Sequence, residues 1–240
     1  MKKQTPYKST ARYYDLIYSW KDYKNEADRL KQLIKKYKKS PGNELLDIAC
    51  GTGRHIQYLK DDFSILATDV NDAMLAVARK NLKGVAVKRA NMLALNLGKQ
   101  FDAIVCLFSS IGYVKTYGNL VKTLRNFVRH LKKGGVVIIE PWITKSAFKV
   151  GLTHMITYST DAIKIARLGV ARVRGNLSIL DMHHLVAEKN KSMKYLVERH
   201  ELGLFETEEV LKLMEANGLQ ARFLRNGLMR DRGLFIGVKR

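Results

Sequence analysis

The chain has 240 residues, of which 46% are hydrophobic and 9% aromatic, so it holds enough apolar material for one large α/β domain and is not a disordered chain. Its 43 lysine and arginine residues outnumber 22 aspartate and glutamate residues. The formal net charge of +21 favours an anionic partner, either nucleic acid or an anionic small molecule. No apolar stretch is long enough to span a bilayer, and the basic start lacks the apolar segment of a secretory signal, so we expect no membrane partner.

The two cysteines, Cys50 and Cys106, lie in apolar runs that are typical of strands. We expect buried thiols in a reducing compartment, and hence a cytoplasmic protein, rather than a disulfide framework. His183 and His184 are adjacent on a predicted strand and therefore point to opposite faces of it. The sequence predicts no metal site.

Predicted strands and helices alternate over the first 150 residues. Apolar side chains three and four residues apart predict a helix over 24–38. Short apolar runs predict strands over 44–49, 64–69, 84–91, 101–108 and 136–142, with helices over 54–60, 71–82 and 118–135. Asn71 or Asp72 would begin the helix over 71–82, and Gly134 or Gly135 would end the helix over 118–135. This order indicates a parallel sheet with helices on both faces.

The pattern changes after residue 150. Polar and apolar residues alternate over 161–174, 177–189 and 193–205, which predicts antiparallel strands joined by turns at 175–176 and 190–192. A helix is predicted over 206–218, with acidic residues in its first turn and Gly218 at its end. Two last strands, over 219–227 and 232–240, are separated by a short loop and are therefore expected to be antiparallel.

The segment LLDIACGTGRH, residues 45–55, joins the first predicted strand to a helix through a glycine-rich turn. Ala49, Gly51 and Gly53 stand where backbone has to make room for a ligand at the carboxyl end of a parallel strand. A dinucleotide fingerprint would have a third glycine at the position of Ile56, and the lysine of a phosphate-binding loop is absent. Both ligands are therefore disfavoured.

Asp69 ends the second predicted strand, 22 residues after Asp47 in the first. A carboxylate at this place can accept both ribose hydroxyls of an adenosine, although Asp69 by itself could equally cap the following helix. Asn91 would bond an adenine amine while Met92 packs on the ring, and residues 106–113 would line the same site. Together with the glycine turn, these residues favour an adenosine-containing ligand.

Four segments, LLDIACGTGRH, TDVNDAML, CLFSSIGY and GGVVIIEPW, carry a resemblance to a known family. In this order they resemble the motifs of class I S-adenosylmethionine-dependent methyltransferases. The resemblance implies an α/β fold with a Rossmann-like seven-stranded sheet, an antiparallel last strand, and S-adenosyl-L-methionine as cofactor. The cofactor-binding residues that the motifs and the resemblance imply are Tyr14, Tyr23, Ala49, Gly51, Gly53, Asp69, Val70, Met74, Asn91, Met92 and Leu107.

Further segments, YYDLIY…KDY, CLFSSIG, IEPW, LFE and RGLFIGV, are similar to the dTDP-aminosugar N,N-dimethyltransferases of deoxysugar biosynthesis. In that family an inserted antiparallel β-meander helps to form the substrate site and a dimer contact, so the resemblance implies an aminosugar acceptor and a homodimer. Tyr113 stands where the family has histidine, and Asn91 where it has aspartate.

We expect residues 1–240 to form one methyltransferase domain. Its parts would be an N-terminal helical lid over 1–43, cofactor-binding β/α units over 44–150, the β-meander over 151–204, and a closing helix and hairpin over 205–240. The acceptor site would lie between the lid and the meander.

Methyl transfer from a sulfonium is an in-line displacement, so most of the catalysis comes from positioning the nucleophile in a dry site. Tyr7 and Tyr113 are the candidate catalytic residues, since the Tyr113 side chain would orient an amine or stabilise a developing cation. Tyr7, Tyr14 and Tyr23 would close over the cofactor or acceptor; alternatively, these aromatic residues only anchor the first segment to the sheet edge.

Three functions are compatible with these residues. The first is methyl transfer to a small molecule, where a diphosphate-bearing substrate would suit the positive charge. Arginines available to meet such a substrate are Arg172, Arg174, Arg230 and Arg232. The second is methylation of tRNA or rRNA, although the [DN]-P-P-[YF] loop typical of base-amine methylation is replaced by FSSI. The third is a catalytically silent protein that only binds the cofactor.

Overall fold

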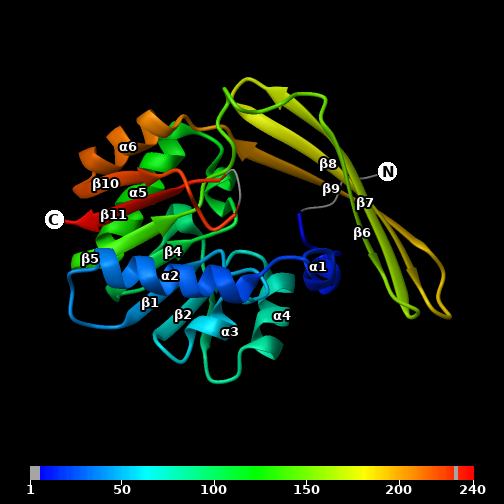
Figure 1. The fold of residues 1–240 in the computed structure, drawn as a ribbon, viewed down its shortest axis with the longest axis horizontal. Helices are drawn as coiled ribbons and strands as arrows, with labels where there is room; N and C mark the ends of the chain where they lie inside the picture. Colours follow the sequence, from blue (N-terminus) through cyan, green and yellow to red (C-terminus); the bar gives the residue numbers. More distant parts are fainter. Residues whose placement is uncertain (1–5, 230–231) are drawn as a thin grey trace.

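Two β-sheets make up the fold, one of seven strands and one of four. The computed structural model describes residues 6–229 and 232–240. In Figure 1 the four-stranded sheet stands away from the larger one, and helix α1 (Ala11–Ile17) lies between them.

The large sheet has the order β10-β11-β5-β4-β1-β2-β3. Its strands are β1 (Glu44–Ile48), β2 (Ser64–Asp69), β3 (Ala86–Arg89), β4 (Phe101–Cys106), β5 (Leu131–Ile139), β10 (Leu219–Leu224) and β11 (Leu234–Lys239). Strands β1 to β5 are parallel, whereas β11 runs antiparallel to both β5 and β10. The predicted seven-stranded sheet with an antiparallel last strand is confirmed.

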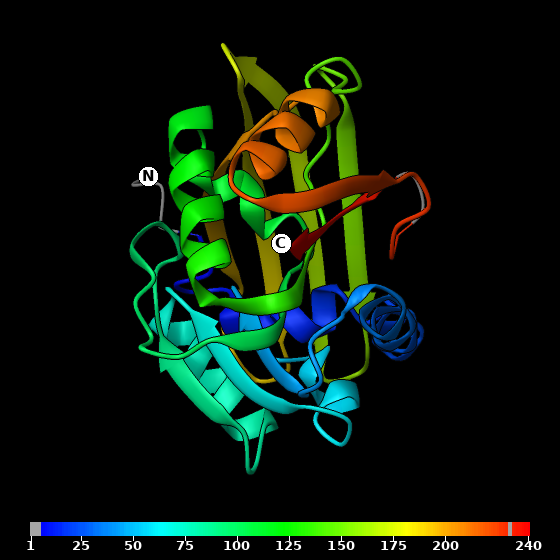
Figure 2. The same ribbon diagram turned by 90° about the vertical axis from the view of Figure 1, so that its left-hand side faces the viewer.

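Helices cover both faces of this sheet. They are α2 (Tyr23–Tyr37), α3 (Ile56–Leu59), α4 (Asp72–Asn81), α5 (Tyr117–His130) and α6 (Thr207–Ala216), with short 3-10 turns η1 (Met92–Ala94) and η2 (Ser110–Val114). Figure 2 shows α5 and α6 on one face and α2 on the other. Leu45 packs into the core on the α2 side and Leu46 into the core on the α5 side, because successive side chains of a strand point to opposite faces. Full burial of one such side chain stabilises the fold by about 1.5–3 kcal/mol.

The predicted end of the helix over 118–135 is wrong. Helix α5 ends at His130, and Leu131 already pairs with Phe101 at the start of β5. The register shifts just after this pair, and Gly134 there has a φ of 75°. Its carbonyl accepts the N–H groups of the chain that leads from α2 into β1. The glycine pair therefore shapes a bulge inside a strand rather than a helix end.

The smaller sheet is an antiparallel meander of β6 (Thr153–Ser159), β7 (Ile163–Arg174), β8 (Leu177–Glu188) and β9 (Lys194–Gly203), in that order. The last three strands match the predicted ones, with turns at 175–176 and 190–192. The sequence analysis missed β6, an edge strand whose side chains alternate only between exposed and half-buried. Its half-buried face is apolar only at Ile156 and Tyr158, which pack beside α1, so the alternation on which the prediction relied is short.

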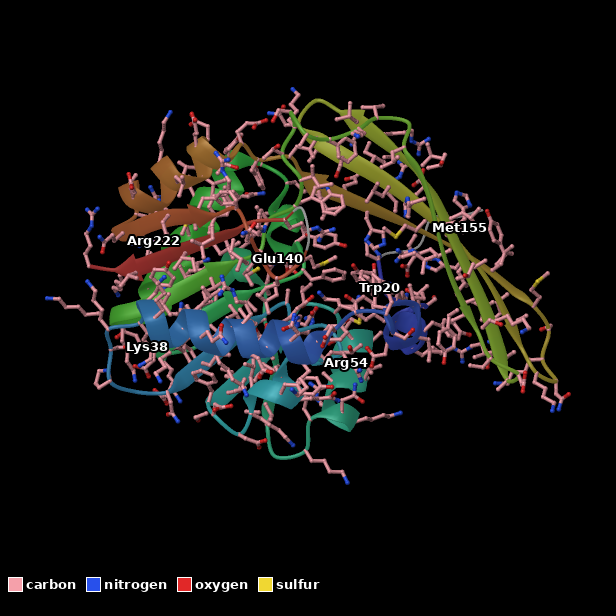
Figure 3. All side chains as sticks on the ribbon, in the orientation of Figure 1. Trp20, Lys38, Arg54, Glu140, Met155 and Arg222 are labelled. Atoms are coloured by element: carbon pink, nitrogen blue, oxygen red, sulfur yellow. The ribbon has the colours of Figure 1, made fainter. Side chains whose placement is uncertain are left out.

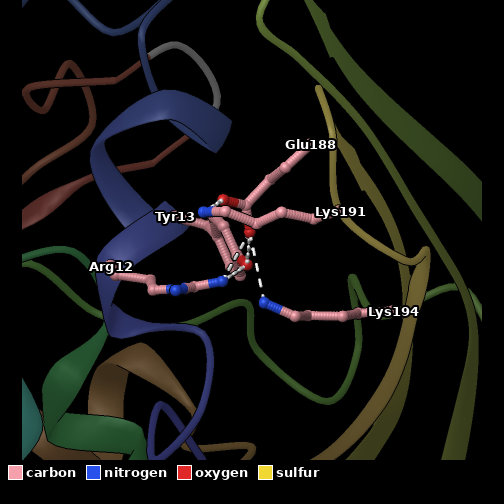
Figure 4. A network of polar contacts seen from close by, with 5 residues as sticks. All are labelled: Arg12, Tyr13, Glu188, Lys191 and Lys194. Atoms are coloured by element: carbon pink, nitrogen blue, oxygen red, sulfur yellow. Dashed lines mark hydrogen bonds and ion pairs between the residues drawn. The ribbon is translucent and has the colours of Figure 1, made fainter.

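Helix α1 is held against the inner face of the meander. Tyr13 and Ile17 pack on Ile165 of β7 and Val186 of β8. At one end, Glu188 gathers a polar network: Arg12 Nη2 lies 2.6 Å from Glu188 Oε1, and the Tyr13 hydroxyl donates to the same oxygen at 2.7 Å (Figure 4). The pKa of Glu188 is lowered to about 2, mainly by a hydrogen bond from Lys191 and next by one from Tyr13. Lys194 and Arg12 contribute in the same direction.

Candidate active site

The carboxyl ends of β1, β2, β4 and β5 meet at the edge of the large sheet that faces the meander (Figure 1). The chain leaves β1 for β2 on one side, and later returns to place β4 on the other side of β1. In parallel sheets, ligands bind at such a reversal of strand order. We call the loops at 49–55, 69–71, 107–116 and 140–142 the carboxyl edge.

The glycine turn after β1 follows a left-handed backbone path. Ala49, Gly51 and Gly53 have φ angles of 60°, 58° and 82°. A Cβ atom on Gly51 would meet nothing within 4 Å, so the backbone there is open to a ligand. On Gly53 it would lie 2.5 Å from Leu82 Cδ1, so this glycine is needed for packing against the end of α4.

Asp69 faces this turn from the end of β2. Its Oδ2 accepts the Gly51 N–H at 2.9 Å and its Oδ1 accepts the Asn71 N–H at 2.8 Å. The cap of α4 is Asn71, whose Oδ1 accepts the Ala73 N–H at 2.9 Å and the Met74 N–H at 3.1 Å. The alternative role of Asp69 as a helix cap is therefore wrong, and the Asn71 cap is confirmed. Burial raises the pKa of Asp69.

The other residues with predicted cofactor roles lie in different surroundings. Val70 is exposed next to Asp69, and Met74 is buried in the first turn of α4. The Asn91 side chain caps η1 by accepting the Leu93 N–H at 3.0 Å, and half-buried Met92 packs against the core on the α5 side. Leu107 is buried in the core on the α2 side, directly after β4.

Three hydrogen bonds join the N-terminal segment to the loops after β1 and β2 and to the end of α4. Asn71 Nδ2 donates to the Pro6 carbonyl at 2.9 Å. From α1, Asp15 accepts the Thr52 hydroxyl at 2.6 Å and Asn81 Nδ2 at 3.4 Å. The first bond brings the segment before α1 to the loop that carries Asp69, and the two bonds of Asp15 hold α1 to the glycine turn and to the end of α4.

Tyr23 and Arg54 lie beside the glycine turn with unused polar atoms. The Arg54 guanidinium lies 5.4 Å and Lys21 Nζ 5.3 Å from the centre of the Tyr23 ring, which also packs edge-on against His55. Within the part of the chain that the structure describes, the Tyr23 hydroxyl and Arg54 Nε are buried and make no hydrogen bond. Unpaired buried polar groups at a ligand-binding edge fit a cofactor with a charged, polar end.

A chain of half-buried and buried side chains crosses from the N-terminal segment to the meander. The Tyr7 hydroxyl lies 3.0 Å from that of Tyr113 in η2, and the Tyr113 hydroxyl lies 2.6 Å from Nδ1 of His200 in β9. His200 Nε2 lies 3.6 Å from Oε2 of Glu198, whose Oε1 accepts the Thr10 hydroxyl at 2.7 Å.

Tyr7 and Tyr113, the predicted catalytic pair, are thus brought together. Tyr14 joins them through its ring, whose centre lies 5.6 Å from that of Tyr7. The sequence analysis missed Glu198 and His200. Their signal was the spacing of two residues on a predicted strand, which places both on one face.

The loop after β4 holds two successive residues in the left-handed region, Phe108 with φ 49° and Ser109 with φ 65°. The Phe108 N–H donates to Glu140 Oε2 at 2.6 Å, and Arg232 Nη1 donates to Ser109 Oγ at 2.7 Å. The Arg232 guanidinium also lies 5.0 Å from the centre of the Trp142 ring. Left-handed residues other than glycine cost about 1–3 kcal/mol each, and these bonds to charged groups hold the loop in place.

Glu140, at the end of β5, lies on the side of the large sheet that faces the meander (Figure 3). Its Oε1 makes no hydrogen bond to any described residue, and burial raises the pKa of its carboxyl. Of the other predicted arginines, Arg172 pairs with Asp181 and Arg174 lies 3.5 Å from Glu201. By strand alternation, both arginines lie on the meander face opposite to that of His200. Glu201, the partner of Arg174, also accepts a hydrogen bond at 2.8 Å from Lys115 of the carboxyl edge. Arg230 lies outside the described residues.

Comparison with known proteins agrees with this geometry. The family described as "Methyltransferase domain" matches residues 45–135. The chain is 34% identical to the dTDP-3-amino-3,4,6-trideoxy-alpha-D-glucopyranose N,N-dimethyltransferase of Streptomyces venezuelae, over 94% of this chain and 95% of the relative. It is 32% identical to the dTDP-3-amino-3,6-dideoxy-alpha-D-glucopyranose N,N-dimethyltransferase of Streptomyces fradiae, over 95% and 90%. The chain belongs to the dTDP-aminosugar N,N-dimethyltransferase family.

This chain has the same fold as the crystal structure of Streptomyces venezuelae DesVI. The TM-score is 0.90 and the identity 33%, over 96% of this chain and 98% of the DesVI chain. The sugar N-methyltransferase KedS8 from Streptoalloteichus matches with a TM-score of 0.86 and 32% identity, over 95% and 92%. The predicted Rossmann-like methyltransferase fold is therefore confirmed. The protein is a methyltransferase.

Proposed function

We propose that this protein methylates the amino group of a nucleotide-linked aminosugar. The observation that carries the proposal is the extent of the match: it spans nearly the whole chain, including the meander that brings His200 to the Tyr113 hydroxyl at the carboxyl edge. The two Streptomyces relatives are named for dTDP-linked 3-aminosugars. A substrate of this class carries a diphosphate, which suits a net charge of +21.

The methyl donor is proposed to be S-adenosylmethionine, bound against the glycine turn, where it would supply a methyl group made electrophilic by its sulfonium. Asp69, oriented by two backbone N–H groups, would accept the ribose hydroxyls, and the open backbone at Gly51 allows close approach. Tyr23 would offer its unpaired hydroxyl to the polar end of the cofactor. The remaining proposed contacts are Tyr14, Ala49, Gly53, Val70, Met74, Asn91, Met92 and Leu107.

The acceptor would lie between the carboxyl edge and the meander. Its diphosphate would meet Arg232, whose guanidinium is already held at this edge by Ser109 and Trp142. Its amine would meet the Tyr7 and Tyr113 hydroxyls, which position the nitrogen in line with the methyl group. Because methyl transfer needs no protonation of the leaving thioether, positioning and exclusion of water do most of the work.

The segment assignments follow the same geometry, over the residues described. Residues 1–43 are proposed as the lid, 44–150 as the cofactor-binding units, 151–204 as the substrate-binding meander, and 205–240 as the closing helix and hairpin.

The two cysteines support the cytoplasm as the proposed compartment, because both are free thiols. Cys106 is buried, whereas Cys50, expected to be buried, is half-buried. No helix within 6–229 and 232–240 is long and apolar enough to cross a membrane.

A homodimer is proposed through the outer face of the meander, away from α1. Exposed apolar side chains gather on this face, and Met155 on β6, with 64% of its surface exposed, is labelled in Figure 3. Its companions on β7, β8 and β9 are Leu168, Val170, Leu185 and Tyr195. Met155→Glu is expected to shift the protein toward monomers in analytical ultracentrifugation, while Met193→Glu at the β8–β9 turn leaves the sedimentation coefficient unchanged. A monomeric wild type would contradict this assembly.

The test of the function is a transfer assay with methyl-labelled S-adenosylmethionine, in which dTDP-3-amino-3,6-dideoxyglucose and total RNA are offered separately. We expect the aminosugar to gain one and then two methyl groups by mass spectrometry, and RNA to stay unlabelled. Label in RNA but not in the sugar would instead support the RNA methyltransferase. Binding of the cofactor without transfer to either would support a catalytically silent protein.

A further inference from the structure

The meander buries more ionisable groups next to Tyr113 than packing requires. Glu198 and His200 are 1% and 2% exposed, and His184 on the neighbouring strand is 3% exposed. His200 Nε2 and His184 Nδ1 make no hydrogen bond to the described residues. Burying a carboxylate and two imidazoles costs stability unless every polar atom is paired, whereas apolar side chains would fill the same volume at no such cost. The cluster therefore points to chemistry.

The hydrogen bonds of Tyr7, Tyr113 and His200 form a path along which a proton can move toward His200. With its proton on Nε2, the His200 ring accepts the Tyr113 hydroxyl at Nδ1 and points its N–H toward Glu198. The far end of the chain is Tyr7, whose hydroxyl lies 3.0 Å from that of Tyr113 and whose ring centre lies 5.0 Å from that of His200. A proton delivered at the Tyr113 hydroxyl thus has a continuous path to a buried imidazole that faces a carboxylate.

We propose that His200 takes up, through the Tyr113 hydroxyl, the proton that the acceptor amine releases. This step rests on the proposed function, in which an amine is the nucleophile. An N–H proton of the ammonium form of the acceptor passes to Tyr113 Oη while the proton of Tyr113 passes to His200 Nδ1, and the nitrogen becomes a neutral amine. The free electron pair of the nitrogen then forms the new N–C bond as the S–C bond of the donor breaks. The imidazolium formed at His200 is stabilised by Glu198.

The groups around His200 make it the proton acceptor of the cluster. Burial raises the pKa of both Tyr7 and Tyr113, so neither holds a negative charge. Burial lowers the pKa of His184 to about 4, with Arg167 on β7 acting in the same direction and Glu198 against it. Arg167 is itself turned to the Tyr18 hydroxyl, at 2.7 Å. Of the two imidazoles, His200 is the one whose ring nitrogen lies within hydrogen-bond distance of the Tyr113 hydroxyl.

His200 is a positioning and relay residue, because it acts through Tyr113. Its test is the pH profile of kcat with dTDP-3-amino-3,6-dideoxyglucose. We expect His200→Gln to lower kcat by about 10²-fold near neutral pH, with the loss shrinking as the pH rises and the amine deprotonates in solution. KM for S-adenosylmethionine should stay unchanged. Tyr113→Phe should give the same profile, and the double variant should lose no more than either single one.

The matched control is His183→Gln, which alters the neighbouring histidine on the opposite face of β8. Its pH profile should match that of the wild type. Equal loss of kcat at every pH in His200→Gln would overturn the relay and leave a structural role. Additive losses in the double variant would also overturn it.

A second measurement needs no acceptor. The signals of the His200 ring protons are followed by NMR across pH with S-adenosylhomocysteine bound. They are assigned as the signals that disappear from the spectrum of His200→Gln. Tyr113→Phe should shift the midpoint of this titration, and His183→Gln should not. A midpoint unmoved by Tyr113→Phe overturns the relay. If the coupling is present but no aminosugar is methylated, the proposed function has failed and the relay serves another nucleophile.

Discussion

Asp69 offers the sharpest test of the cofactor site. Its carboxylate is 8% exposed and accepts two backbone N–H groups, one from the glycine turn and one from the cap of α4. Asp69→Ala removes this acceptor while leaving the left-handed backbone of Gly51 in the chain. We expect loss of cofactor affinity with little loss of secondary structure.

The size of the loss follows from the hydrogen bonds involved. A hydrogen bond to a charged group contributes about 1.5–3 kcal/mol, so two ribose hydroxyls bonded to Asp69 amount to about 3–6 kcal/mol. Since 1.4 kcal/mol corresponds to a factor of ten, Kd should rise by about 10²- to 10⁴-fold. Asp69→Asn keeps one acceptor oxygen and should lie at the lower end of this range.

The assay is isothermal titration calorimetry with S-adenosylhomocysteine. The matched control is Asp72→Ala, which removes an equal charge three residues further on, from a side chain 75% exposed that lies 3.4 Å from Arg89. Asp72→Ala should leave Kd unchanged. A wild-type Kd for Asp69→Ala, or an equal loss in both variants, would refute the ribose-binding role.

Two further predictions concern stability. Gly53→Ala should lower the free energy of unfolding by about 1–3 kcal/mol, because the new Cβ would meet Leu82. Gly84→Ala is the control: Gly84 is also left-handed, but a Cβ there would meet nothing within 4 Å, so the cost should be only about 1 kcal/mol. Equal shifts in Tm by calorimetry would contradict the packing explanation. Burial raises the pKa of Asp47, and the nearby Asp69 raises it further. Because the folded-state pKa is raised, the protonated carboxyl favours the folded state at low pH, and this stability is lost as the pH rises through the folded-state value. The Tm of Asp47→Asn should therefore exceed that of the wild type by more at about pH 8 than at about pH 5, and a difference independent of pH would show that the charge is not responsible.

The sequence by itself determined the features that depend on local pattern. Apolar runs predicted the strands of the parallel sheet, because a strand buried on both faces is largely apolar. The glycine turn and Asp69 were recognised because they lie in sequence next to the strands that position them. The resemblance carried by the same segments identified the family and predicted the cofactor.

Only the tertiary structure decided which residues meet across long separations. The Gly134–Gly135 pair forms a bulge because Leu131 pairs with Phe101, a contact that no pattern within α5 reveals. Strand β6 owes its place to pairing with β7 and to the packing of Ile156 and Tyr158 beside α1. Tyr113 and His200 are 87 residues apart and touch because the meander folds back over the carboxyl edge. Local periodicity determines elements, whereas a site assembled from several elements depends on how those elements pack.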